Sequence, residues 1–105
     1  MKHASWVMGI VLLAAGQAGA AEHVVKMAGG AYEPAVLNAK VGDTIRFVNQ
    51  DADWHNVFVP TAAFALDLGK QEQGAETILN LTKPGTFEVE CVQHLPMLLT
   101  VEVAP

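Results

Sequence analysis

The sequence predicts an all-β domain, either a sandwich or a barrel, that follows an N-terminal signal peptide. Apolar and polar residues alternate with a period of two through most of the chain after residue 21, and turn residues separate the alternating segments. The chain has 105 residues, of which 51% are hydrophobic, and no repeat or linker-like stretch interrupts residues 22–105. This length and composition suit one compact domain.

The first 20 residues have the organisation of a secretory signal peptide. Lys2 precedes an apolar run from Trp6 to Ala15, and small residues at 18–20 provide a cleavage site. A membrane-spanning helix needs roughly 20 apolar residues, about twice the length of this run. We therefore expect cleavage after Ala20, a mature domain of residues 21–105, export to the periplasm and no stable membrane anchor.

The N-terminal half of this domain is expected to contain four strands. Their sequences are EHVVKM at 22–27, PAVLNAKVGD at 34–43, TIRFVN at 44–49 and HNVFV at 55–59. The second ends in a Gly42-Asp43 turn, Ile45 and Phe47 share one face of the third, and Pro60 closes the fourth. These segments carry the β-branched and aromatic residues that favour strands.

The C-terminal half is expected to contain three more strands. Their sequences are TILNLT at 77–82, TFEVEC at 86–91 and LTVEV at 99–103. In the second of these, Phe87, Val89 and Cys91 lie on one face and the intervening glutamates on the other. Residues 61–74 are the least strand-like, and we expect a long loop there, with room for one helical turn around 62–65.

The single cysteine, Cys91, has no partner for a disulfide within its own chain, although exported domains usually use cysteines in pairs. His94 and Met97 follow it at intervals of three, on the tight loop that leads to the last strand. Thiolate, imidazole and thioether donors on one loop suit copper, and two histidines, a cysteine and a distant methionine form the blue-copper arrangement. Methionine is not among the usual zinc ligands.

This set needs a second histidine, and His23 and His55 are the candidates outside the signal peptide. His55 begins a strand directly after an acidic, polar turn, so it can meet a loop at the same end of a sandwich. His23 opens the first strand and has no such argument. We therefore expect His55, Cys91, His94 and Met97 to bind one copper ion.

Two stretches of the chain resemble the cupredoxins, the small blue (type 1) copper proteins, and most closely their amicyanin and plastocyanin-like branch. These are YEPAVLNAKVGDTIRFVNQDADWHNV and PGTFEVECVQHLPM, the second with the family's Cys-x-x-His-x-x-Met spacing. The resemblance implies a Greek-key β-sandwich in which His55, Cys91 and His94 are the equatorial ligands and Met97 is the axial one. It also implies that Asn56 ties the two ligand-bearing loops together and that its backbone amide approaches the Cys91 sulfur.

The favoured function is one-electron transfer, with copper cycling between Cu(I) and Cu(II). Redox partner proteins are expected to dock near His94, Leu95 and Pro96, where apolar residues surround a ligand histidine. A periplasmic copper chaperone or copper store would use the same donors and stays open. An enzyme with Cys91 as nucleophile is not expected, because there is no oxyanion-hole motif and Met97 has no role in it.

The chain is acidic, with a formal net charge of −5 at pH 7 and no basic patch. Such a chain is a poor candidate for binding nucleic acid, and a cationic protein partner suits it better. We expect a monomer. Cleavage after Ala20 would also expose Ala21-Glu22-His23, which can wrap Cu(II) in a square-planar nitrogen set. The simpler interpretation, which we favour, is that His23 only begins a strand.

Overall fold

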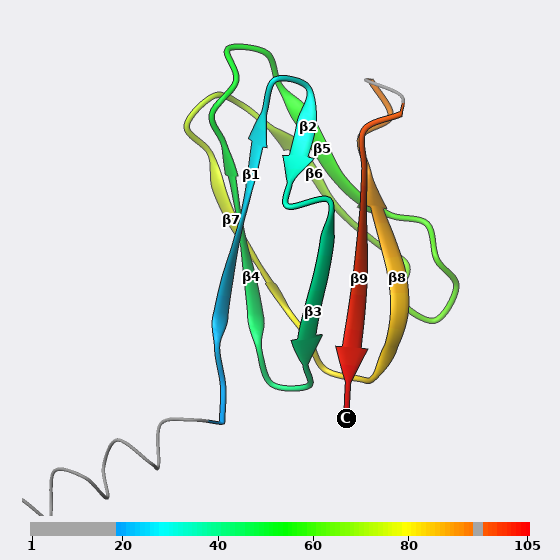
Figure 1. Ribbon diagram of the computed structural model, residues 1–105. Coiled ribbons are helices and arrows are strands. Elements are labelled where there is room, and N and C mark those ends of the chain that lie inside the picture. The colour runs from blue at the N-terminus through cyan, green and yellow to red at the C-terminus, as the bar shows by residue number, and fades with distance from the viewer. Residues whose placement is uncertain (1–18, 94–95) are drawn as a thin grey trace, which may run out of the picture.

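Two β-sheets packed face to face make up the protein, which we describe from a computed structural model (Figure 1). The structure describes residues 19–93 and 96–105, so nearly all of the expected signal peptide lies outside the described residues. Within these ranges there is no helix long and apolar enough to cross a membrane. The strands are β1 Glu22–Ala28, β2 Ala31–Glu33, β3 Val36–Lys40, β4 Thr44–Asn49, β5 His55–Val59, β6 Leu66–Gln71, β7 Glu76–Asn80, β8 Gly85–Glu90 and β9 Leu98–Ala104.

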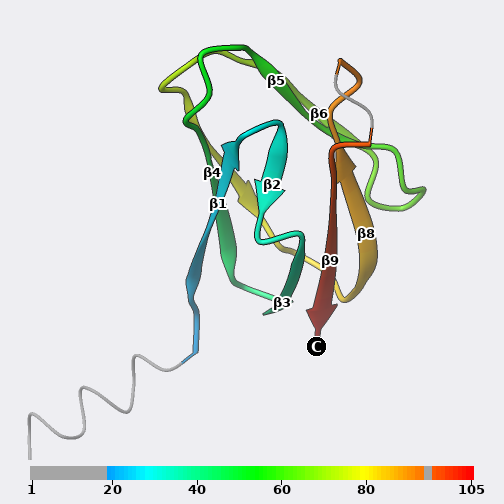
Figure 2. The same ribbon diagram turned by 45° about the horizontal axis from the view of Figure 1, so that its top comes forward.

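The order of the strands places the chain's loops at two ends of a sandwich. One sheet has the order β2-β1-β4-β7 and the other has the order β3-β9-β8-β5-β6. Strands β1 and β4 pair in parallel, as do β3 and β9, and the other pairs are antiparallel. As a result, the β1–β2, β4–β5 and β8–β9 connections gather at the upper end of the molecule (Figures 1 and 2). The all-β sandwich predicted from the sequence is confirmed.

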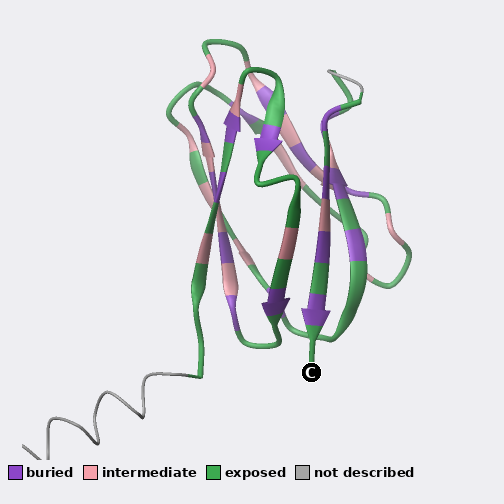
Figure 3. Ribbon diagram, viewed as in Figure 1, coloured by how far each residue is buried: buried purple, intermediate pink, exposed green. Residues whose placement is uncertain are grey.

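The core lies between the two sheets, where the inward side chains of alternating strands meet. Burial alternates along β4, β8 and β9, where the purple bands of Figure 3 are separated by pink or green ones. The inward faces expected for TIRFVN, TFEVEC and LTVEV are therefore confirmed. The least exposed apolar side chains of the core are those of Val25, Met27, Ile45, Phe47, Val57, Val89, Cys91, Leu99 and Val101.

The expected loop over residues 61–74 is wrong, because Leu66–Gln71 forms β6. This strand pairs with β5 at the edge of its sheet, and the register shifts between Val57 and Phe58. Most of its side chains are exposed or half-buried, and Gly69 interrupts it with a φ of 80°. An edge strand with this pattern carries no alternation for the sequence to reveal. A turn closed by the Phe64 amide and the Thr61 carbonyl (3.0 Å) remains before it.

Candidate metal centre

Three of the four expected copper ligands are among the described residues, and they lie where two loops meet the strands at the upper end of the sandwich (Figure 1). His55 is the first residue of β5, Cys91 directly follows β8, and Met97 directly precedes β9. His94 lies outside the described residues. Strand alternation explains this placement, because it directs each of the three side chains inward from the end of a buried strand.

The imidazole and the thiol come together although they are 36 positions apart in the sequence. His55 Nδ1 lies 3.8 Å from Cys91 Sγ, and the two residues are 1% and 0% exposed. At a zinc site an ion lies about 2.3 Å from sulfur and about 2.0 Å from nitrogen, so one ion of this size can contact both atoms. The separation of the two donors therefore fits a shared metal ion.

Met97 is the third donor among the described residues, and it lies at the β9 end of the loop that begins with Cys91. Its side chain is buried with Cys91 in the core, and its carbonyl accepts a hydrogen bond from the Cys91 amide at 3.4 Å. This bond closes the loop between β8 and β9. Among the described residues, no three histidine, cysteine or carboxylate side chains group as a metal site. A metal centre here therefore requires a thioether or a residue outside the described ranges.

Asn56 links the two loops that carry these donors. Its backbone amide donates to Cys91 Sγ at 3.3 Å, and its side-chain Oδ1 lies 3.8 Å from the same sulfur. Its carbonyl accepts a hydrogen bond from the hydroxyl of Tyr32, on β2, at 2.6 Å. The approach of the Asn56 amide to the sulfur, implied by the resemblance, is confirmed.

A second link joins the same loops closer to the surface. Gln93 donates from Nε2 to an Asp53 carboxylate oxygen at 3.2 Å, and the other oxygen accepts from the Trp54 amide at 3.1 Å. The Lys70 ammonium lies 4.9 Å from the centre of the Trp54 ring. Trp54 therefore contributes a cation–π contact beside His55.

Buried Asn49, at the end of β4, organises the loop that leads to His55. Its Nδ2 donates to the carbonyls of Asp53 and Gln71 at 3.0 and 2.8 Å, and its Oδ1 accepts from the Asp51 amide at 2.9 Å. All polar atoms of this side chain are thus used, as burial requires. Sequence reasoning did not identify Asn49. A polar residue that ends a strong strand and precedes a polar loop was the available signal.

The sequence did not identify Asp51 either, although its carboxylate contacts a predicted ligand. Its Oδ2 lies 2.7 Å from His55 Nε2. The same carboxylate accepts from the amides of Gly29 and Gly30, in the β1–β2 turn. The Gly30 amide and then the His55 ring hold the pKa of Asp51 below its ordinary value. The signal in the sequence was an acidic residue four positions before the histidine.

His23 lies away from this centre. It belongs to β1, at the opposite end of the sandwich from the β8–β9 loop (Figure 1). Its Nε2 lies 2.8 Å from Asp43 Oδ2, and the amides of Ala21 and Lys40 also donate to that carboxylate. Mainly because of the His23 contact, the pKa of Asp43 falls to about 2. The expectation that His23 begins a strand is confirmed.

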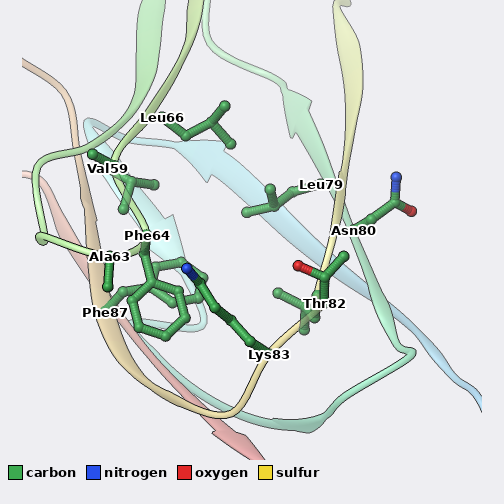
Figure 4. A pocket seen from close by; sticks show the side chains of 11 residues that line it. Val59, Ala63, Phe64, Leu66, Leu79, Asn80, Thr82, Lys83 and Phe87 are labelled. Atoms are coloured by element: carbon green, nitrogen blue, oxygen red, sulfur yellow. The ribbon is translucent and has the colours of Figure 1, made fainter.

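A cavity of about 220 Å³ lies elsewhere, at the end of β5 remote from His55. Figure 4 shows Phe64 and Phe87 stacked at one side of it, with Lys83 beside them. The ring centroids are 5.0 Å apart, and the Lys83 ammonium lies 5.1 Å from the Phe64 centroid. His55, Cys91 and Met97, the three predicted copper ligands among the described residues, do not line this cavity.

Comparison with protein families gives a match to the cupredoxin-like domain over residues 3–101. The chain is 38% identical over 76 residues to amicyanin from Paracoccus denitrificans, a match that covers 68% of this chain and 56% of that protein. The chain thus spans little more than half the length of that relative. It is 33% identical over 99 residues to plastocyanin from Prochlorothrix hollandica, covering 84% of this chain and 76% of the plastocyanin.

Solved structures of amicyanin have the same fold as this chain. A Cu(I) amicyanin variant superimposes with a TM-score of 0.74 at 30% identity, covering 78% of this chain and 81% of that one. An oxidized amicyanin variant gives a TM-score of 0.74 at 32% identity over the same shares. The fold and the family assignment therefore rest on sequence and structure together.

Proposed function

The chain belongs to the cupredoxin family, and from this membership we propose that it is a blue copper protein that carries single electrons between redox partner proteins. One copper ion binds His55, Cys91, His94 and Met97. The observation that carries the proposal is the 3.8 Å separation of His55 Nδ1 and Cys91 Sγ, two buried donors from distant parts of the chain. Their separation and burial suit one shared ion.

Bound copper supplies the one-electron couple between Cu(I) and Cu(II). The chain supplies the ligands and keeps them in place. Cys91 would provide the thiolate, whose sulfur accepts a hydrogen bond from the Asn56 amide, and buried Met97 would provide a weak thioether donor. Because His55 and Cys91 are fixed at strand ends, the chain would hold these donors with little rearrangement, which would suit fast electron transfer.

The protein is exported to the periplasm after cleavage behind Ala20, and the copper-binding domain comprises residues 21–105. Partner proteins dock near His94, Leu95 and Pro96, the mature protein is a monomer, and it is not an enzyme. The apolar run between Trp6 and Ala15, followed by small residues, supports export.

The proposal is tested by adding Cu(II) to the purified processed protein and recording its visible spectrum. We expect an intense thiolate-to-copper absorption that the Cys91→Ser variant lacks. The His23→Gln variant is the matched control, because it removes a histidine at the other end of the sandwich and should keep the full absorption. A wild-type protein that stays colourless would refute the proposal.

A second measurement separates an electron carrier from a copper chaperone or store, which would use the same donors. The loaded protein is mixed with a Cu(I) chelator, and its electron self-exchange is measured in parallel. A carrier keeps its copper in both oxidation states and exchanges electrons rapidly. Fast loss of copper without electron exchange would assign the site to copper handling instead.

A further inference from the structure

The carboxylate of Asp51 is shared by a metal-ligand histidine and a hairpin turn. His55 Nε2 lies 2.7 Å from Oδ2, the Gly29 amide donates to Oδ1 at 2.7 Å, and the Gly30 amide donates to Oδ2 at 3.0 Å. Both glycines have positive φ angles, of 62° and 72°, which turn consecutive amides toward one point. Such consecutive amides form a concavity that binds an anion. Here the anion is a side chain of the same protein.

This arrangement determines which nitrogen of His55 carries a proton. An ionised carboxylate can only accept hydrogen bonds, so His55 Nε2 must be the donor of its bond to Asp51. In a neutral imidazole the other nitrogen, Nδ1, is then the acceptor. Nδ1 is the atom that faces Cys91 Sγ at 3.8 Å. The tautomer set by Asp51 is therefore the one that presents a lone pair toward the metal position.

The position of the carboxylate is itself held from two sides. The Asp51 amide donates to Asn49 Oδ1 at 2.9 Å, and Asn49 is 1% exposed. The glycine amides fix the carboxylate from the β1–β2 turn, 21 and 22 positions away in the sequence. The His55 ring is 1% exposed, whereas the Asp51 side chain is 22% exposed. The rotation of a buried ring is thus controlled by a carboxylate at the protein surface.

We propose that Asp51 is a positioning residue for copper, which holds the proton on His55 Nε2, aims Nδ1 at the metal and couples the β1–β2 turn to the ligand. This inference rests on the proposed function of the same site. A carboxylate behind a ligand histidine also raises the donor strength of its ring, and losing such a partner typically costs about 10–100-fold in metal affinity. A stronger donor favours Cu(II) over Cu(I), so Asp51 lowers the reduction potential.

Two substitutions separate the positioning from the charge. Asp51→Ala removes every contact of the carboxylate. Asp51→Asn is isosteric, and with its oxygen at the Oδ2 position it can still accept from His55 and Gly30. Its amide nitrogen then meets the Gly29 amide, a donor against a donor. The asparagine variant should therefore keep the tautomer but lose the charge.

The first readout needs no metal, and it is the ¹⁵N NMR signature of the His55 ring in the metal-free protein. We expect one tautomer, with the proton on Nε2, in the wild type and in Asp51→Asn, and a mixture of tautomers in Asp51→Ala. Asp43→Ala is the matched control, because it removes an equally close carboxylate from His23 at the other end of the sandwich. It should alter the His23 signals and leave those of His55 unchanged.

The second readout is the copper-loaded protein. We expect Asp51→Ala to bind Cu(II) about 10–100-fold more weakly than the wild type. Both Asp51 variants should have a higher reduction potential, and Asp43→Ala should change neither property. If Asp51→Ala does not fold, Asp51→Asn decides the matter, and an unchanged affinity and potential in it overturn the inference.

The failure of the inference can be distinguished from the failure of the proposed function. A wild type that shows the thiolate-to-copper absorption, with variants that keep its tautomer, affinity and potential, would refute the role of Asp51 alone. A wild type that never binds copper would refute the proposed function. The metal-free NMR measurement would then still decide whether Asp51 sets the His55 tautomer.

Discussion

The hydroxyl of Tyr32 offers a clean test of how β2 supports the metal centre. It donates to the Asn56 carbonyl at 2.6 Å, and the amide of the same residue donates to Cys91 Sγ. The Tyr32 ring is 2% exposed and packs edge-on against Phe47, with the centroids 6.3 Å apart and the planes at 75°. Tyr32→Phe removes only the hydroxyl and leaves this packing in place.

The expected effect follows from the hydrogen bond alone. A typical intramolecular hydrogen bond contributes about 0.5–1.5 kcal/mol, and a buried partner that loses its bond adds a desolvation cost of about 1–3 kcal/mol when nothing replaces it. The ring stays, so no cavity forms. We therefore expect the free energy of unfolding to fall by about 1–2 kcal/mol, with no change in its dependence on denaturant.

Urea unfolding of the metal-free protein, followed by circular dichroism, measures this change. Phe47→Leu serves as the comparison, because it disturbs the ring contact and retains the hydroxyl. An unchanged unfolding midpoint in Tyr32→Phe would show that the hydroxyl contributes nothing to stability. A loss well above 3 kcal/mol would show that the ring itself had moved, and either result refutes the reasoning.

Three further predictions concern titration and backbone conformation. Burial, and then the nearby Cys91 and Glu90, raise the pKa of Tyr32 well above 10, so an ultraviolet titration of this single tyrosine should have its midpoint above 10. Because the unfolded chain ionises first, stability should fall as the pH rises above 10. The pKa of Asp43 is lowered from 3.8 to about 2, so its ionised carboxylate contributes fully to the free energy of unfolding above pH 4, and this contribution is lost toward pH 2. Thermal unfolding should therefore show that Asp43→Asn loses less stability than the wild type over that interval. Gly85→Ala should lower the free energy of unfolding by about 1–3 kcal/mol in urea, because φ is 137° and the new Cβ would lie 2.7 Å from the Phe64 ring; an equally stable variant would contradict this.

The buried strands could be predicted from the sequence because their pattern is local. In β4, β8 and β9 one face is in the core and the other is exposed or half-buried, so buried residues recur at every second position. The position of Cys91 at the inward end of β8, and of His55 at the start of β5, follows from the same pattern. The ligand candidates could therefore be predicted from the sequence alone.

The features that the sequence did not reveal depend on contacts between distant residues. Strand β6 is mostly exposed at a sheet edge, and β2 has only three residues, so neither carries a periodic signal. The role of Asp51 depends on two glycine amides in another hairpin. Tyr32 lies in β2, and nothing in that short segment indicates a partner for its hydroxyl. Only the packing of the two sheets brings the hydroxyl to the Asn56 carbonyl.

The central claim is that a thiolate and two imidazoles hold one copper ion in the same way in both oxidation states. X-ray absorption at the copper edge, recorded on the oxidised and the reduced protein, tests it most directly. We expect one strongly bound sulfur and two nitrogen ligands in both states, and loss of that sulfur in Cys91→Ser. A copper environment of nitrogen and oxygen alone, or a ligand set that changes on reduction, would contradict the account.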